Sequence, residues 1–157
     1  MSLVVKDSGK RRVFNSGGAR DAEEGKGRFD LLLPMMLTRL SKLYESGAIK
    51  YDARNWEKGI PSSSFLDSAK RHLNKHHEGR RDEDHLAAVL FNVCGVMFNE
   101  IMISRTLLPP ELNDLPNYFP EKCPVHKKYK VEKKPRSDCP YCLIIWNKKV
   151  YYEEIEF

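Results

Sequence analysis

Four residues near the C-terminus have the types and spacing of a metal site: Cys123, His126, Cys139 and Cys142. They form a C-x2-H pair and a C-x2-C pair, separated by twelve residues. Zinc prefers four nitrogen or sulfur ligands at about 2.0–2.3 Å, and the x2 spacing lets one turn present two of them. A proline follows Cys123 and another follows Cys139, so each pair begins as a turn. The pattern predicts a structural Zn2+ site. The alternatives are a disulfide and unrelated free thiols.

Positive charge is concentrated around these four residues. The chain has a net charge of +5, and residues 120–150 hold nine Lys or Arg against three acids. Residues 1–119 are nearly balanced, with eighteen Lys or Arg and sixteen acids. A basic zinc module could hold the phosphate backbone of a nucleic acid. The alternative is a solvated face that keeps a very small domain soluble.

Length and composition fit one modest domain with an appendage. The chain has 157 residues, of which 41% are hydrophobic, so it can bury a core. There is no run of about 18 apolar residues and no apolar stretch at the N-terminus, so neither membrane insertion nor secretion is expected. Three of the four cysteines fall in the zinc pattern, which suits the reducing cytoplasm. Cys94 lies in an apolar stretch and is expected in the core.

Composition divides the chain into four parts. These are a flexible N-terminal arm (1–25), a helical domain (26–108), a Pro- and Asn-rich linker (109–120) and a zinc-binding module (121–157). The predicted fold class is mainly α, with a small C-terminal zinc ribbon or knuckle that contains a β-hairpin.

Apolar periodicity predicts three helices in the helical domain. The first covers residues 34–46 and stops at Gly47, and an ordered loop follows at 48–63. The second begins at Ser64, with Asp67 as a variant of the capping box, and ends at Gly79. The third runs over residues 82–104, and the β-branched and aromatic residues at 143–152 predict the C-terminal hairpin.

Polar residues accompany the apolar face of the third helix. His85, Asn92 and Asn99 are spaced by seven and share one stripe, and buried polar groups need partners. Glu78 and Asp82 flank a short turn before this helix and could share a hard cation such as Mg2+ or Mn2+. The alternatives are hydrogen bonds from the stripe to nearby backbone, and acids that complement a helix N-terminus.

The loop before the second helix combines cations with an aromatic ring. Lys50, Arg54 and Lys58 surround Asn55 and Trp56. Cations suit phosphates, an indole suits stacking, and an amide suits a base edge. The loop therefore indicates a nucleotide pocket, although Trp is also a good core residue. His72 and His76, four apart on the second helix, could also face a metal or a phosphate.

Several of these segments resemble one family. The most specific is K-Y-x2-R-N-W-E-K-G-I-P at residues 50–61, and others are Gly27–Leu31, Arg71-His72, Glu78-Gly79, and Asp82 to Ala88 with Asn92. Together they resemble the N-terminal domain of phage dATP/dGTP diphosphohydrolases, which are all-α, MazG-like proteins of the kind called MazZ. The resemblance covers residues 26–100 and leaves out the zinc segment.

The resemblance implies metal-dependent cleavage of a purine deoxynucleoside triphosphate to a monophosphate and pyrophosphate, in a cytoplasmic protein of phage or prophage type. Acids of such enzymes hold Mg2+ or Mn2+, and the candidates here are Glu78, Asp82 and Asp84. The implied nucleotide-binding residues are Lys50, Tyr51, Arg54, Asn55, Trp56, Lys58, His72, His85 and Asn92. Small helical folds of this kind complete their pocket by association, so a homo-oligomer is expected.

One departure from the family pattern leaves other functions open. MazG-like enzymes have an acid pair on one helix and a second on the next, whereas the first helix here offers only Glu45 and the second has no pair. A site short of ligands would bind a nucleotide without cleaving it. The alternatives are therefore a protein that sequesters a nucleotide, including a cyclic signalling nucleotide, and a nucleic-acid-binding protein that acts through the basic zinc module.

Overall fold

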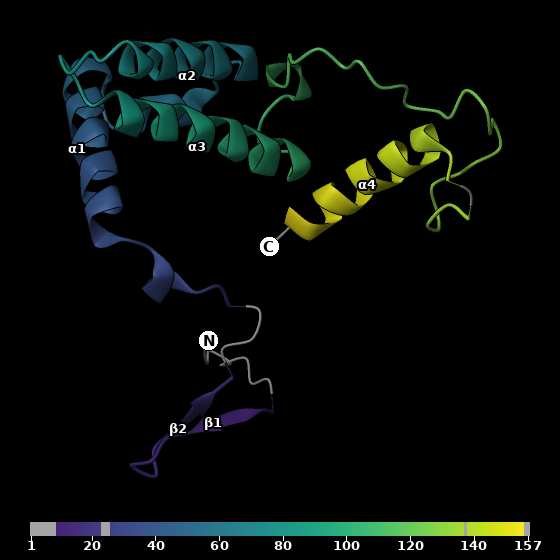
Figure 1. Ribbon diagram of the computed structural model, residues 1–157, viewed down its shortest axis with the longest axis horizontal. Coiled ribbons are helices and arrows are strands. Elements are labelled where there is room, and N and C mark those ends of the chain that lie inside the picture. Colours follow the sequence, from purple (N-terminus) through teal and green to yellow (C-terminus); the bar gives the residue numbers. More distant parts are fainter. Residues whose placement is uncertain (1–8, 23–25, 137, 156–157) are drawn as a thin grey trace. The chain divides into compact units, whose positions relative to one another are not determined.

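Four α-helices make up most of the ordered structure in the computed structural model, which describes residues 9–22, 26–136 and 138–155. They are α1 (Pro34–Tyr51), α2 (Ser62–His77), α3 (His85–Ser104) and α4 (Pro140–Ile155). Short 3-10 turns occupy Phe29–Leu31, Asn55–Lys58 and Pro110–Leu112 (Figure 1). The predicted mainly α fold is confirmed. The chain divides into two compact units, with the boundary between Leu37 and Thr38.

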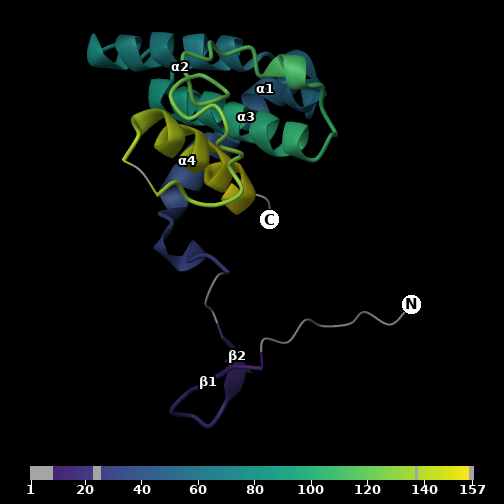
Figure 2. The same ribbon diagram turned by 90° about the vertical axis from the view of Figure 1, so that its right-hand side faces the viewer.

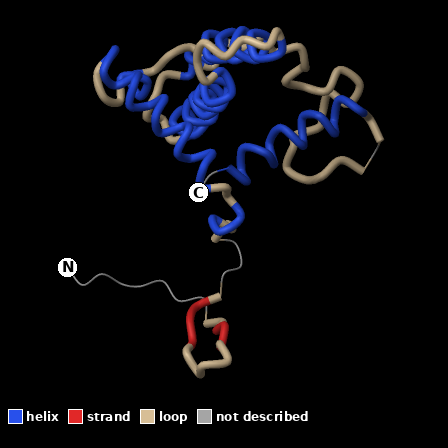
Figure 3. Tube along the Cα trace, turned by 60° about the vertical axis from the view of Figure 1, so that its left-hand side comes forward, coloured by secondary structure: helices blue, strands red, loops and turns tan. Residues whose placement is uncertain are grey.

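A small antiparallel hairpin lies in the first unit. Strand β1 (Arg11–Val13) pairs with β2 (Ala19–Asp21), with Val13 opposite Ala19 (Figure 3). The five-residue loop between them closes with a hydrogen bond from the Phe14 N–H to the Gly18 carbonyl, and Gly17 has a φ of 83° that favours glycine. The sequence predicts only a flexible arm for residues 1–25. Its residues 1–8 and 23–25 lie outside the described part, and its flexibility stays a prediction.

The second unit is built around α2 and α3, which lie side by side in two views (Figures 1 and 2). Phe65 and Ala69 of α2 are buried against α3, where Ala88 and Asn92 are also buried. The close approach occurs at Gly95, where an added Cβ would lie 2.5 Å from the Phe65 ring. The glycine in this apolar helix therefore makes room for an aromatic ring.

The helix boundaries differ from the predicted ones for local reasons. Helix α1 continues through Gly47 to Tyr51, because one glycine costs a helix only about 1 kcal/mol and good helix formers follow it. Helix α2 begins at Ser62 rather than Ser64, and the predicted Ser64/Asp67 capping box does not form. Instead, the Asp114 carboxylate accepts a hydrogen bond from the Ser63 N–H at 2.8 Å, and an acid at this end also complements the helix dipole.

The predicted C-terminal β-hairpin is wrong, because residues 140–155 form helix α4. Pro140 suits the first turn of a helix, and the preceding Cys139 and first-turn Cys142 come to one side. Helical spacing also places Lys149 Nζ 3.4 Å from Glu153 Oε1. The same Nζ lies over the Trp146 ring, 5.8 Å from its centroid. A short apolar run cannot distinguish strand from helix by its periodicity alone.

Helix α3 begins and ends close to the prediction. Asp84 is its N-cap and accepts a hydrogen bond from the Ala87 N–H at 3.0 Å. By length and composition, α3 is the one helix in the described part of the chain that could cross a membrane, with a mean hydropathy of 1.9. It buries His85, Asn92 and Asn99, and the core helix of a soluble protein meets the same criterion.

The stability of the α2–α3 contact should depend on Gly95. We expect Gly95→Ala to lower the free energy of unfolding by about 1–3 kcal/mol, because the new methyl group overlaps the Phe65 ring. Gly47→Ala is the matched control, since its Cβ would meet nothing within 4 Å inside α1 and should add about 0.5–1 kcal/mol. Urea denaturation of both variants measures the difference. A stabilised Gly95→Ala variant would contradict this packing.

Candidate functional site

A pocket of about 940 Å³ opens between α1, the Asn55–Lys58 turn, α2 and the start of α3. Of the residues predicted to bind a nucleotide, seven line it: Lys50, Tyr51, Arg54, Asn55, Trp56, His72 and Asn92. Lys58 and His85 are not among its lining residues. Lys58 supports the wall, since its Nζ donates to Asn55 Oδ1 at 3.3 Å.

The extended α1 explains how these residues come together. Because the helix runs to Tyr51, Tyr44, Ala48 and Tyr51 share one stripe, and all three line the pocket. The chain then turns sharply, with left-handed φ values of 73° at Asp52 and 61° at Arg54. Such values are uncommon outside glycine and must be held by the surrounding structure.

Trp56 both packs in the core and lines the pocket. Its ring meets those of Tyr44 and Phe98 edge-on, at centroid distances of 5.7 and 4.8 Å. Tyr44 in turn meets Phe91 at a centroid distance of 5.1 Å, and Tyr44, Trp56 and Phe91 of this aromatic cluster line the pocket. Trp56 therefore packs against other aromatic side chains and lines the pocket at the same time.

Cations and acids occupy the pocket rim together. Arg54 donates to Glu57 at 2.5 Å, and Lys50 lies over the Tyr51 ring at 4.8 Å. A hydrogen bond with Tyr51 raises the pKa of Lys50, which keeps its charge. Five further charged residues line the pocket that the sequence did not predict there: Glu45, Asp52, Glu57, Arg71 and Glu83. Glu45 lies on α1, and Asp52 follows its last residue, Tyr51, in the sharp turn.

The three acids proposed to hold Mg2+ or Mn2+ have separate partners. Glu78 accepts from Asn74 Nδ2 at 2.9 Å and pairs with Arg80 at 3.2 Å. Asp84 receives two hydrogen bonds from Arg39, which lower its pKa to about 2. Neither these two nor Asp82 is among the residues that line the pocket. A cation shared by Glu78 and Asp82 stays a prediction.

Two histidines meet at the pocket edge. His72 Nδ1 lies 3.2 Å from His85 Nδ1, and the other nitrogen of His85, Nε2, lies 3.1 Å from Asp82 Oδ1. The side chain of His85 is fully buried, whereas that of His72 is 19% exposed. Desolvation lowers the pKa of His72, so its ring is mostly neutral at pH 7.

The asparagines of the α3 stripe have different partners. Asn92 lines the pocket, and its Nδ2 donates to the Ala88 carbonyl at 2.7 Å. Asn99 lies seven residues further along α3. Its Nδ2 donates to the Ile60 carbonyl at 2.8 Å and to Ser62 Oγ at 3.1 Å. Asn99 thus fixes the start of α2. Its bond to the Ile60 carbonyl agrees with the alternative that residues of this stripe bond to nearby backbone.

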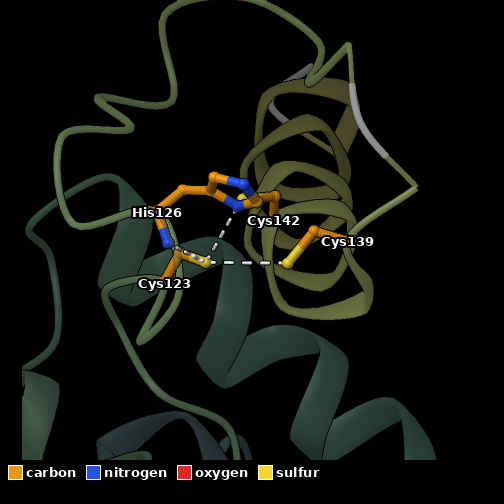
Figure 4. Close-up of side chains that lie close together, drawn as sticks. All are labelled: Cys123, His126, Cys139 and Cys142. Carbon is orange, nitrogen blue, oxygen red and sulfur yellow. Dashed lines mark hydrogen bonds between the residues drawn. The ribbon is translucent and has the colours of Figure 1, made fainter.

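The cysteines and histidine of the zinc pattern also converge (Figure 4). Cys123 Sγ lies 3.7 Å from Cys139 Sγ and 3.7 Å from His126 Nδ1, and Cys142 Sγ lies 3.4 Å from that nitrogen. Bonds of about 2.0–2.3 Å arranged tetrahedrally require separations of about 3.5–3.8 Å between such ligand atoms. The cluster is therefore compatible with a structural zinc ion.

Burial and local backbone shape this cluster. Cys123 and Cys142 are 2% and 1% exposed. Desolvation, together with hydrogen bonds that the Cys142 S–H donates to the sulfur atoms of Cys123 and Cys139, raises the pKa of Cys142 to about 12. Desolvation opposes ionisation of Cys123 as well, but N–H groups of the His126 and Val125 backbone lower its pKa. The His126 N–H lies 3.1 Å from Cys123 Sγ, which fixes the turn between these two residues.

Comparison with known proteins gives one match. The family model described as dATP/dGTP diphosphohydrolase, N-terminal, matches residues 16–108, which is more than half of the chain. This range contains every residue that lines the large pocket and ends before the zinc cluster. No curated protein and no solved structure matches the chain.

Proposed function

Since the chain belongs to the family of dATP/dGTP diphosphohydrolase N-terminal domains, we propose that it cleaves a purine deoxynucleoside triphosphate to the monophosphate and pyrophosphate. The observation that supports this best is the large pocket, which carries cations, an indole and carboxylates within the matched segment. Its volume of about 940 Å³ is ample for one nucleotide. The protein would act in the cytoplasm, where such nucleotides occur, and in that of the host cell if a phage encodes it.

The pocket residues suggest how a nucleotide would be held. Lys50, Arg54 and Arg71 would face the phosphates, where arginine can make paired hydrogen bonds. Trp56 would stack on the base, and Asn55 would contact a base edge.

The acids near the pocket suit a hard cation. Glu45, Asp52, Glu57 and Glu83 line it, and carboxylate oxygens are the ligands that Mg2+ and Mn2+ prefer. A bound ion would supply charge for the phosphates and a water of lowered pKa. Glu78 and Asp82 remain the other proposed ligands.

A second proposal is sequestration without cleavage. Two of the pocket acids already contact cations, Glu57 with Arg54 and Glu83 with Lys75, so a catalytic ion must compete for them. Incubation with dATP or dGTP followed by denaturation separates the two proposals. Intact nucleotide in the recovered ligand supports sequestration, and monophosphate with pyrophosphate supports hydrolysis.

A third proposal is nucleic-acid binding by the zinc module. A second pocket, of about 520 Å³, is lined there by Lys128, Lys130, Lys133, Lys134 and Arg136. Several closely spaced cations would release counterions from a phosphate backbone, so affinity should fall steeply with salt. Filter binding of DNA and RNA at several salt concentrations tests it.

We also propose that the protein is a homo-oligomer. Leu86, Val93 and Met97 form one exposed apolar stripe on α3, although this helix is apolar enough to be a core element. Only 28% of its most apolar window is buried within the single chain. A second copy is the partner that could cover the stripe in every molecule. Sedimentation that reports a monomer at all concentrations would contradict this.

Nucleotide affinity should depend on Trp56 and Asn55. We expect Trp56→Phe to weaken binding by about 1 kcal/mol or more through lost stacking, and to lower stability slightly because the ring also packs on Phe98. Asn55→Ala should change the preference between purines and pyrimidines. Calorimetric titration with dATP, dGTP and dCTP measures both. If all three affinities stayed unchanged, this loop would not line the binding site.

A further inference from the structure

His72, Glu83 and His85 place three ligand atoms at the corners of a nearly equilateral triangle. His72 Nδ1 and His85 Nδ1 are 3.2 Å apart, and Glu83 Oε1 lies 3.4 Å from the first and 3.2 Å from the second. Bonds of about 2.0–2.2 Å at octahedral or tetrahedral angles require ligand separations of roughly 3.0–3.4 Å. The three atoms therefore already have the spacing that one bound ion would impose.

The hydrogen bond of His85 to Asp82 fixes which nitrogen is free for an ion. Asp82 Oδ1 lies 3.1 Å from His85 Nε2, and an ionised carboxylate can only accept, so Nε2 carries the proton. In a neutral ring Nδ1 then presents a lone pair, directed at His72 and Glu83. A carboxylate that receives the second N–H of a histidine is the usual support of a metal-binding imidazole.

Without a cation, this triangle is poorly satisfied. The lone pair of His85 faces the Glu83 carboxylate at 3.2 Å, and a single proton on His72 Nδ1 must serve both neighbours. Lys75 Nζ also contacts Glu83 Oε1, at 3.4 Å, but an ammonium group has no lone pair and can only donate. A cation at the centre would satisfy all three groups at once.

We propose that His72, Glu83 and His85 bind one divalent transition-metal ion at the edge of the large pocket. Imidazole nitrogens favour ions such as Co2+, Ni2+, Fe2+ or Zn2+ over Mg2+. His72 and Glu83 line the pocket, so the remaining coordination positions face it and are open to an oxygen atom of a bound ligand. Metal binding here does not rest on the proposed function. Only a role for the ion in nucleotide cleavage does.

The test titrates Co2+ into the full chain after its zinc has been loaded. We expect one Co2+ per chain, with the visible absorption of Co2+ bound by nitrogen and oxygen ligands. A thiolate-to-cobalt charge-transfer band should be absent, which distinguishes this site from the Cys/His cluster. His72→Gln and Glu83→Gln should each weaken binding by more than tenfold, as changes outside the ligand shell already cost roughly 10–100-fold. Both side chains are partly exposed, so these variants should fold.

His77→Gln is the matched control, because His77 lies exposed on the same helix outside the triangle. It should bind Co2+ as tightly as the original chain. The inference is overturned if Co2+ enters only the thiolate cluster, or if His72→Gln and Glu83→Gln bind as the control does. Tight Co2+ binding by a protein that cleaves no nucleotide would contradict the proposed function alone.

Discussion

Replacing Cys139 by serine should release the zinc ion and leave the last third of the chain open to protease, while α1–α3 stay folded. The described residues of that segment bury little besides Cys123 and Cys142, and a segment of this size cannot hold a hydrophobic core alone. Zinc binding contributes about 10–16 kcal/mol to folding in comparable small modules, so losing one of four ligands should unfold it. Limited proteolysis and zinc analysis of the same samples measure both effects.

Cys94→Ala provides the matched control for this experiment. Cys94 is the one cysteine outside the cluster, lies on α3, and has a pKa that is raised by desolvation, as expected of an inert core thiol. This variant should keep its zinc and its resistance to protease. If the metal-free original chain gave the same cleavage pattern as the zinc-loaded one, zinc would have no structural role.

The second large effect is expected at Asp82. Asp82→Asn should lower nucleotide hydrolysis by about 10–100-fold, because an amide cannot hold the proton of His85 on Nε2 as a carboxylate does. The Asp82 side chain is 63% exposed, so the fold should tolerate the change. Steady-state rates with dATP and dGTP, together with a thermal melt of each variant, measure the loss.

Glu78→Gln distinguishes the two possible roles of Asp82. If the two acids share a Mg2+ or Mn2+ ion, both variants lose activity to a similar extent. If Asp82 acts through His85, Glu78→Gln keeps most of its rate, because Glu78 contacts only Asn74 and Arg80 in the described residues. A wild-type rate in Asp82→Asn would remove this carboxylate from the site.

The four residues of the Cys/His cluster could be identified from the sequence, because pairs of Cys or His at x2 spacing are typical of metal sites. Cys123, His126, Cys139 and Cys142 come together as the C-x2-H and C-x2-C pairs predicted. The secondary structure of residues 140–155 could not be predicted in this way. The apolar run at 143–152 fits either a strand or a helix, and the choice depends on Pro140 and on contacts within α4 that only the folded chain contains.

In the helical domain, too, some elements could be predicted from the sequence and others could not. Periodicity located α2 and α3 because their apolar faces are long, whereas Gly47 ended the predicted first helix too early. The last turn of α1, up to Tyr51, was therefore predicted as loop, although Ala48, Lys50 and Tyr51 of this turn line the pocket. The triangle of His72, Glu83 and His85 joins residues from two helices and a turn, and no spacing rule in one segment could reveal it.

The most direct test of the central proposal is product analysis after incubation with each deoxynucleoside triphosphate and Mn2+. We expect dATP and dGTP to give the monophosphate and pyrophosphate in equal amounts, with slower reaction of dCTP and dTTP, since the family is one of dATP/dGTP diphosphohydrolases. Recovery of every nucleotide unchanged, by a protein whose pocket nevertheless binds one of them, would contradict hydrolysis and leave sequestration as the function.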